Sequence, residues 1–449
     1  MSYPRFVSAG ALALAAIIAS PWLSTNGNAQ VATTANPPTF NHDVAPILYA
    51  KCVHCHRPGE VAPMSLMTFT QVRPWARAIQ QKTTTRTMPP WGADPHYGTF
   101  RNDRSLTDRE IETISTWVDA GAPEGSSKDL PPLPRFVDGW QIGQPDQVFE
   151  MVNEFDIPAS GAVDYQYFEV PTHFTEDRWM QAGEVRAGDS SHVHHIIVYV
   201  KEPHPAARTA AVAVRPILDP TAPRPTVSRP AATPAAPAAD ASSRTGDNML
   251  VNWAVGEDAP VFPAGLAKRI PAGSTLVFQV HYTTNGKPGR DRSRIGLIFA
   301  KQPPQHEVRT ALIANPLFTI PAGSGNHLVE AEATFSDNVN VYTMHPHMHL
   351  RGKDMTYTLT RPDGSRDVIL SVPKYDFGWQ TDYWLAQPLA VAKGSTIRVT
   401  AHFDNSPANR ANPDPTKSVR WGDQTWEEMM IGFFTYTVDT AQPAQTASR

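Results

Sequence analysis

Short apolar or alternating runs recur after residue 139, each bounded by turn residues. Successive side chains of a β-strand point to opposite faces, so runs of this length and alternation predict strands. The runs are Tyr165–Val170, Ile196–Val200, Thr275–Val280, Ile295–Phe299, Met355–Leu359 and Ile431–Tyr436. Several strands with turns between them favour β-sandwiches over an α/β sheet.

Helical patterns stand nearer the N-terminus. Residues 42–48 predict a first helix. Thr107-Asp108-Arg109-Glu110 is a capping box, and the apolar positions from Ile111 to Val118 then share one helix face until Gly121. We therefore expect a helical region that precedes the strands.

The first 29 residues have the pattern of a secretory signal. Arg5 gives a positive n-region, residues 10–19 are apolar, and Gly27-Asn28-Ala29 offers a small-x-small cleavage site. The apolar run is shorter than the roughly 20 residues that a membrane-spanning helix needs. We expect an exported protein with no membrane span after the signal is removed; an uncleaved anchor is the alternative.

Composition narrows the choice of partners. The net charge is −4 and no basic block occurs, so nothing points to nucleic acid or to an anionic membrane surface. The 43 prolines against 27 glycines fit a loop-rich β protein. Proline and alanine dominate residues 203–240, which are expected to form a mobile insertion.

The two cysteines of the chain belong to one motif, Cys52-Val53-His54-Cys55-His56. The spacing lets both thiols add to the vinyl groups of haem while His56 takes an axial position on the iron. A zinc or redox CxxC is the alternative, but the partner cysteines of a zinc site are missing. For the sixth ligand we expect Met88, in a proline-stiffened loop, ahead of Met64 and Met67.

Two histidine clusters lie in the strand-rich part of the chain. His347 and His349 sit on or beside a predicted strand, where residues two apart project from the same face and can point at one ion. His194 and His195 are adjacent, so they can share an ion only if the strand end twists or the rings bind through different nitrogens. His192 and His194 are the geometrically simpler pair, and spacing alone does not choose between the pairs.

Two further residues extend these clusters into candidate ligand sets. His281 closes the predicted strand at 275–280, and Met429 precedes the strand at 431–436. Three histidines suit copper, zinc, iron or nickel, whereas a thioether favours Cu(I). Core packing is the alternative for Met429 and for its neighbour Met430.

Four motifs occur in the order found in the copper type II, ascorbate-dependent monooxygenases, the family of peptidylglycine α-hydroxylating monooxygenase and dopamine β-monooxygenase. The motifs are His194-His195, Gln279–Tyr282, His347–Lys353 and Glu427–Met429. Residues 139–438 resemble this family, and residues 40–123 resemble cytochrome c. Unlike the animal enzymes, which are rich in disulfides, this chain has cysteines in its haem motif alone.

The resemblance implies two copper ions and the residues that hold them. An electron-transfer copper would bind His194, His195 and His281. The copper at which O2 and substrate react would bind His347, His349 and Met429. The haem c would bind Cys52, Cys55, His56 and Met88.

These resemblances predict an all-α cytochrome c domain followed by two all-β jelly-roll-like sandwich domains. The predicted segments are a signal peptide (1–29), the cytochrome c-like domain (38–126), a linker (127–138), a monooxygenase N-terminal-like sandwich (139–302, with the insertion 203–240), a C-terminal-like sandwich (303–440) and a tail (441–449).

The expected function is that of a periplasmic monooxygenase. It would hydroxylate an activated C–H bond of a small organic substrate with O2, and an external donor, a reductant or a redox protein, would supply electrons through the haem. The alternative is a periplasmic haem and copper protein that carries electrons or binds copper without oxygenation. A nitrite-reductase-like enzyme is a third reading, weakened because the cysteine ligand of its electron-transfer copper has no counterpart here.

Overall fold

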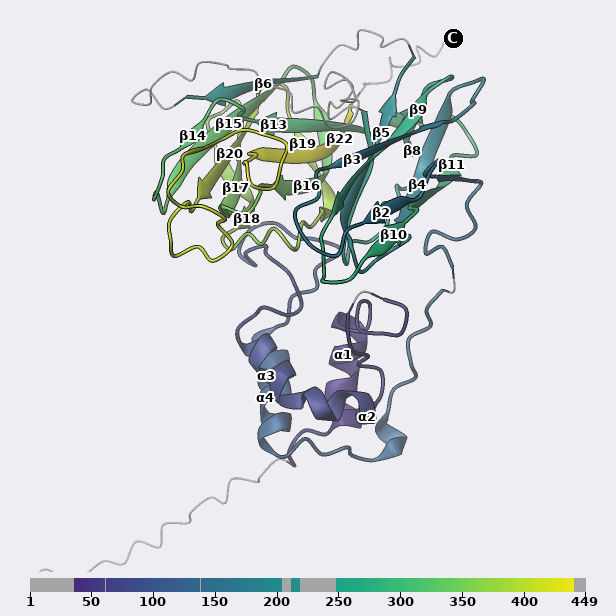
Figure 1. Ribbon diagram of the computed structural model, residues 1–449, viewed down its shortest axis with the longest axis vertical. Helices are drawn as coiled ribbons and strands as arrows, with labels where there is room; N and C mark the ends of the chain where they lie inside the picture. The colour runs from purple at the N-terminus through teal and green to yellow at the C-terminus, as the bar shows by residue number, and fades with distance from the viewer. Residues whose placement is uncertain (1–35, 61, 138, 204–210, 219–247, 440–449) are drawn as a thin grey trace, which may run out of the picture. The chain divides into compact units, whose positions relative to one another are not determined.

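The computed structural model describes residues 36–60, 62–137, 139–203, 211–218 and 248–439 (Figure 1). The predicted signal peptide, the tail and most of the Pro/Ala-rich tract lie outside these residues. Within the described ranges, 38% of residues are in strands and 12% in helices. No helix in this part of the chain combines the length and the apolar character needed to cross a bilayer.

The helices are short and form a small core of their own. They are α1 (Ala45–Lys51), α2 (Phe69–Val72), α3 (Ala76–Thr84) and α4 (Asp108–Asp119), with a π-helix η1 (Phe40–Val44) and 3-10 turns η2 (Arg73–Trp75) and η3 (Ser127–Asp129). The predicted capping box is confirmed: Thr107 accepts from the Glu110 N–H, and the Glu110 carboxylate accepts from the Thr107 N–H. The helix then buries Ile114 and Trp117 against Phe40 and Leu48.

Nine strands build a first pair of sheets. They are β1 (Gln147–Glu150), β3 (Gln166–Pro171), β4 (Arg178–Arg186), β5 (Val193–Lys201), β7 (Met249–Ala254), β8 (Leu266–Ile270), β9 (Thr275–Tyr282), β11 (Arg294–Phe299) and β12 (His306–Glu307). One sheet has the order β1-β11-β4-β8-β12 and the other β3-β9-β5-β7. A separate ribbon pairs β2 (Phe155–Ile157) with β10 (Gly289–Asp291). Buried residues of both sheets, such as Phe278 and Ile295, form one core.

A second pair of sheets follows the same plan. Its strands are β6 (Val212–Ile217), β13 (Arg309–Ala314), β15 (His327–Phe335), β16 (Val339–His347), β17 (Gly352–Thr360), β18 (Arg366–Val372), β19 (Tyr383–Val391), β20 (Thr396–Phe403) and β22 (Ile431–Val438). The sheet orders are β13-β22-β16-β19 and β18-β17-β20-β15-β6, and β14 (Thr319–Ile320) pairs with β21 (Val419–Arg420). All six runs predicted as strands overlap observed strands.

The predicted fold class is nevertheless wrong. There is no large all-α N-terminal domain among the described residues: the longest helix has 12 residues, and the described residues from Pro38 onward group as one compact unit. The reason is that the stretch between α3 and α4 packs into the β part. Ala93 and Phe100 belong to the core of the second pair of sheets, and Phe100 bridges to Leu385.

The two sheet pairs share a buried apolar cluster. Ile197 and Val277 of the first pair form a buried cluster with Ile431 and Phe433 of the second. In addition, β6 lies inside the tract that was expected to be an insertion, yet it pairs with β15 of the second pair, from Val212 opposite Phe335 to Ile217 opposite Glu330.

The position of β6 predicts unequal effects for two substitutions on that strand. Val212 is buried in the second core, whereas Val214 is 39% exposed. Val212→Asp should lower the free energy of unfolding by about 3 kcal/mol or more, because it places an unpaired carboxylate among apolar side chains. Val214→Asp, the matched control, should change it by less than about 0.5 kcal/mol. Urea unfolding midpoints of both variants test this; equal losses would show that β6 does not pack there.

Candidate metal centres

The rings of His194, His195 and His281 converge at neighbouring strands of the first pair of sheets. His194 and His195 lie at the start of β5 and His281 near the end of β9, and one nitrogen from each falls within 4.8 Å of the others. The ring centroids are 5.0 to 5.3 Å apart. These three histidines could hold a metal ion.

A β-bulge explains how two adjacent histidines serve one position. Val193 pairs with Tyr282 of β9, but the next pair is His195 with His281, so His194 is an extra residue on β5. A bulge re-aims a side chain that would otherwise face away. The Nδ1 atoms of His194 and His195 consequently lie 3.0 Å apart. This is the twisted strand end on which sharing by His194 and His195 depends.

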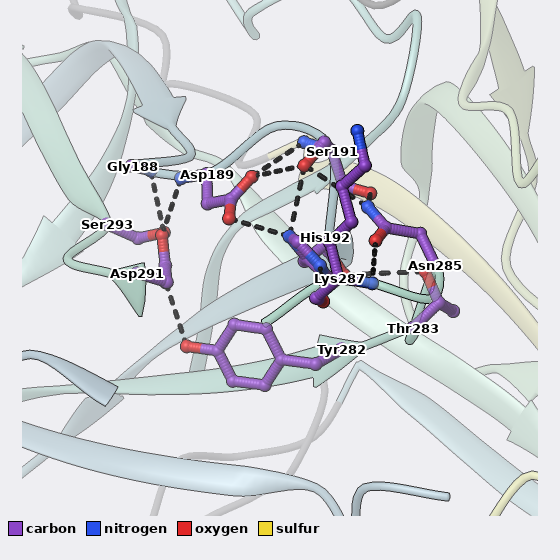
Figure 2. A network of polar contacts seen from close by, with 10 residues as sticks. All are labelled: Gly188, Asp189, Ser191, His192, Tyr282, Thr283, Asn285, Lys287, Asp291 and Ser293. Atoms are coloured by element: carbon purple, nitrogen blue, oxygen red, sulfur yellow. Dashed lines mark hydrogen bonds and ion pairs between the residues drawn. The ribbon is translucent and has the colours of Figure 1, made fainter. Parts of the chain in front are cut away.

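His192 is held by hydrogen bonds within the protein. Its Nδ1 lies 2.6 Å from Asp189 Oδ2 and its Nε2 lies 3.0 Å from the Lys287 carbonyl oxygen (Figure 2). Burial lowers the pKa of His192, but the Lys287 and Asp189 hydrogen bonds outweigh burial and raise it. Both ring nitrogens are engaged, which removes the His192–His194 pair as a ligand set.

The polar network of Figure 2 ties the two ligand-bearing strands together. The Thr283 N–H donates to the His192 carbonyl at 2.7 Å, and the Tyr282 hydroxyl donates to Asp291 at 2.8 Å. Asp291 also accepts from the Asp189 N–H at 3.0 Å. The residues just before His194 and just after His281 are therefore held by one set of bonds, which fixes the register at the bulge.

Burial keeps this first set of rings neutral. It lowers the pKa of His194 to about 4 and that of His281 to about 3, and it holds the pKa of His195 well below its usual range. Neutral imidazoles have a free lone pair for a metal. The Nδ1 of His281 is buried and has no hydrogen-bond partner among the described residues, and an unpaired buried polar atom is costly. A bound ion would satisfy it.

The second set, His347 and His349, lies at the end of β16 and in the turn that follows. The Nδ1–H of His347 donates to Gln380 Oε1 at 2.6 Å, and that of His349 donates to the Glu427 carbonyl at 3.2 Å. Such outer hydrogen bonds fix the tautomer of metal-binding histidines. Both rings thus offer Nε2, and the Nε2 of His349 is buried without a partner in the described structure. Burial lowers the pKa of His347 to about 4 and that of His349 well below its usual range.

Glu428 holds the turn that carries the second set. Its carboxylate accepts from the N–H of His349 at 2.9 Å and from that of Arg351 at 2.7 Å. Burial raises the pKa of Glu428 to about 8, against the opposing effect of these bonds. Sequence reasoning missed the roles of Glu428 and Gln380. An acidic residue directly before an apolar strand was the available signal for Glu428; Gln380 gave none.

The structure separates Met429 from Met430. Met430 is fully buried in the core of the second sheet pair, so core packing accounts for it. Met429 is only partly buried and packs against the cluster that joins the two pairs. Its role as a ligand beside His347 and His349 stays a prediction.

Phe377 lies between the two histidine sets. Its ring stacks on His194 with centroids 4.9 Å apart and an interplanar angle of 15°, and its centroid is 5.9 Å from that of His281 and 6.0 Å from that of His349. The sets are close enough that a charge on His347 or His349 would further lower the pKa of His195. They face one another across one aromatic side chain.

The motif at residues 52–56 has the residue types that would hold a covalent haem. Cys52 and Cys55 are free thiols, and burial raises the pKa of Cys52 to about 12. The Nδ1–H of His56 donates to the Met64 carbonyl at 3.1 Å and leaves Nε2 available. Met64 and Met67 pack against the helical core. Met88 as the sixth ligand stays a prediction.

Comparisons with known proteins add little. No family model and no curated protein matches the chain. Among solved structures, the chain is similar to "PNGF-II in P21 space group", with 8% sequence identity, 65% of each chain covered and a TM-score of 0.27. It is also similar to infectious bursal disease virus Gt strain, with 9% identity, 66% of this chain and 71% of that chain covered and a TM-score of 0.18. A third similar structure is allantoicase, with 8% identity, 56% of this chain and 79% of that chain covered and a TM-score of 0.16. The match thus spans 65% of the first of these chains. Scores this low support no argument.

The assignment of His192 can be tested by metal titration of the purified protein with Cu²⁺. His281→Ala should weaken binding at this site by more than about 100-fold, because it removes a direct ligand. His192→Asn should weaken it by less than about tenfold, because His192 acts through the fold. Isothermal titration calorimetry measures both; equal losses would make His192 a ligand.

The lowered pKa values of the buried histidines also predict that acid reduces the stability of the metal-free protein. In the unfolded chain they bind protons near pH 6.5, whereas in the fold they stay neutral to about pH 4. Between these values the unfolded chain binds more protons, so stability present above pH 6.5 is lost as pH falls toward 4. In thermal melts, the melting temperature should fall steeply from pH 7 to pH 4, and it should fall less steeply in His281→Gln. Replacing the exposed His96 with Gln should leave the pH dependence of the melting temperature unchanged. The same pH dependence in the unaltered protein and both variants would contradict the prediction.

Proposed function

We propose that this chain is an exported, periplasmic copper-dependent monooxygenase that hydroxylates an activated C–H bond of a small organic substrate. The observation that carries the proposal is the pair of buried histidine sets facing one another across Phe377. Each set includes a ring nitrogen that is buried without a hydrogen-bond partner in the described structure, on His281 and on His349. The arrangement agrees with the resemblance to the copper type II, ascorbate-dependent monooxygenases.

The proposed ligands divide between the sets. His194, His195 and His281 would hold the electron-transfer copper, and His347, His349 and Met429 the copper that meets O2. Bound there, copper would supply the two one-electron reductions that the reaction needs, in which R–H, O2, two electrons and two protons give R–OH and water. A soft thioether suits the reduced ion.

A cleft supports the choice of the second set for the chemistry. The cleft has a volume of about 760 Å³ and opens beside His349, which is the one ligand candidate among the described lining residues. Trp91, Tyr375 and Phe377 give the cleft apolar walls. Such walls bind the carbon skeleton of a small substrate and displace water from it.

The residues around the second set hold it in place for the reaction. Gln380 and the Glu427 carbonyl fix both rings with Nε2 presented. Glu428 fixes the backbone at His349, and the Tyr375 hydroxyl donates to the carbonyl of Met348, between the two histidines, at 2.7 Å. Because these bonds are buried, the ligands need little rearrangement when substrate binds.

The haem would be the point at which an external donor delivers electrons. Cys52 and Cys55 would carry it through thioether bonds, with His56 and Met88 as axial ligands. Because the haem would be attached covalently to the same chain as the copper sites, it would act on them at an effective concentration on the order of millimolar.

Copper and haem content test the ligand assignment. The copper-loaded protein should contain two copper ions per haem by elemental analysis and haem absorbance. Met429→Leu should bring that ratio toward one, whereas Met430→Leu, the matched control, should leave it at two. A ratio near zero in the unaltered protein, or zinc in place of copper, would refute the two-copper proposal.

Incorporation of labelled oxygen separates the monooxygenase from a protein that only carries electrons. The reduced, copper-loaded protein is incubated with ¹⁸O2 and small compounds that have benzylic or allylic C–H bonds or C–H bonds next to an amide nitrogen. One ¹⁸O atom in a hydroxylated product, lost in His349→Ala, is the expected result. Reoxidation of the protein without a labelled product from any compound would favour the electron carrier.

A further inference from the structure

The connection between β18 and β19 approaches the haem motif as well as both histidine sets. Gly256, after β7, lies between the two: a Cβ on this glycine would be 3.5 Å from Cys55 Sγ and 3.6 Å from Cζ3 of Trp379. The sulfur and the indole edge are therefore at most 7.1 Å apart, the sum of these two distances. Gly256 has a φ of +84°, which favours glycine, so this position itself places no side chain between them.

Charged residues clamp the haem motif at this point. Arg104 donates to the Gly256 carbonyl and pairs with Asp258 at 2.7 Å. His54, inside the haem motif, lies 3.3 Å from the other oxygen of Asp258. The motif is thus tied to Gly256 and Asp258, which line one small pocket together with Trp379.

Trp379 leads on to the metal ligands. It lies two residues after Phe377, and its neighbour Gln380 donates to the Phe377 carbonyl at 3.3 Å while accepting from His347. Phe377 in turn stacks on His194 and approaches His349. Phe377 and Trp379 therefore belong to one short segment, in which Trp379 lies toward Cys55 and Phe377 lies against both ligand sets.

We propose that Trp379 and Phe377 form the route by which electrons pass from the haem to the copper sites, an inference that rests on the proposed function. In each step one electron leaves ferrous haem, which becomes ferric, and reduces one Cu²⁺ to Cu⁺; no atom is transferred. The close stacking on His194 makes the His194/His195/His281 site the first acceptor. The external donor then reduces the haem again, and two such steps supply one turnover.

Flash reduction of the full-length, haem- and copper-loaded protein tests the route without any substrate. Under anaerobic conditions, laser-excited 5-deazaflavin reduces the haem, and the decay of ferrous haem absorbance is followed while the Cu²⁺ signal is measured by electron paramagnetic resonance. The decay rate should not depend on protein concentration. Protein loaded with zinc in place of copper should show no decay.

The variants locate the route. Trp379→Leu and Phe377→Leu should each slow the decay by about an order of magnitude, and Trp379→Phe should slow it less. Trp75→Leu, which removes an exposed tryptophan from the helical part, should leave the rate unchanged. Copper content and the haem spectrum establish that each variant is folded and loaded.

The outcomes are distinct. Unchanged decay in both leucine variants, decay that scales with protein concentration, or no decay in the copper-loaded protein would overturn the route. Fast decay that slows in Trp379→Leu, together with no ¹⁸O incorporation, would leave the route standing and refute the monooxygenase.

Discussion

The candidate metal centre depends on the connection between β18 and β19, because this segment contacts several parts of the centre. Within eight residues it supplies Tyr375, which holds the turn at Met348; Phe377, which separates the histidine sets; and Gln380, which orients His347. The Asp382 N–H then donates to the partly buried Glu257 at 3.0 Å. Because these contacts lie on one short segment, a shift at any of them moves the others.

Burial is the second constraint. Removing five imidazoles from water is unfavourable unless their polar atoms find partners. The fold supplies partners for the Nδ1 atoms of His347 and His349 but leaves His281 Nδ1 and His349 Nε2 without any among the described residues. A protein can retain such unpaired polar atoms when a bound ligand supplies the missing partner. The same burial keeps the rings neutral, and so one physical effect accounts for both the cost and the capacity to bind a metal.

Local pattern was enough to find the strands, helix α4 and the histidine clusters, because period and capping act over a few residues. It could not choose between His192 and His195. The choice depends on a bulge against β9 and on a hydrogen bond from His192 to Lys287, 95 residues away. For the same reason β6 and Phe100 were misplaced: their burial comes from sheets formed much later in the chain. Long-range pairing, which has no local signature, decided each of these points.

Charge connects the two sets beyond their contacts. A positive charge on the second set lowers the proton affinity of the first, and an ion at either set would likewise oppose an ion at the other. Nearby carboxylates offset this repulsion: Asp376 favours positive charge at His194, and Asp382 lies 3.0 Å from His345 beside the second set. Both belong to the connection between β18 and β19. The segment that separates the sets sterically thus also carries negative charge that would reduce the repulsion between cations bound at both sets.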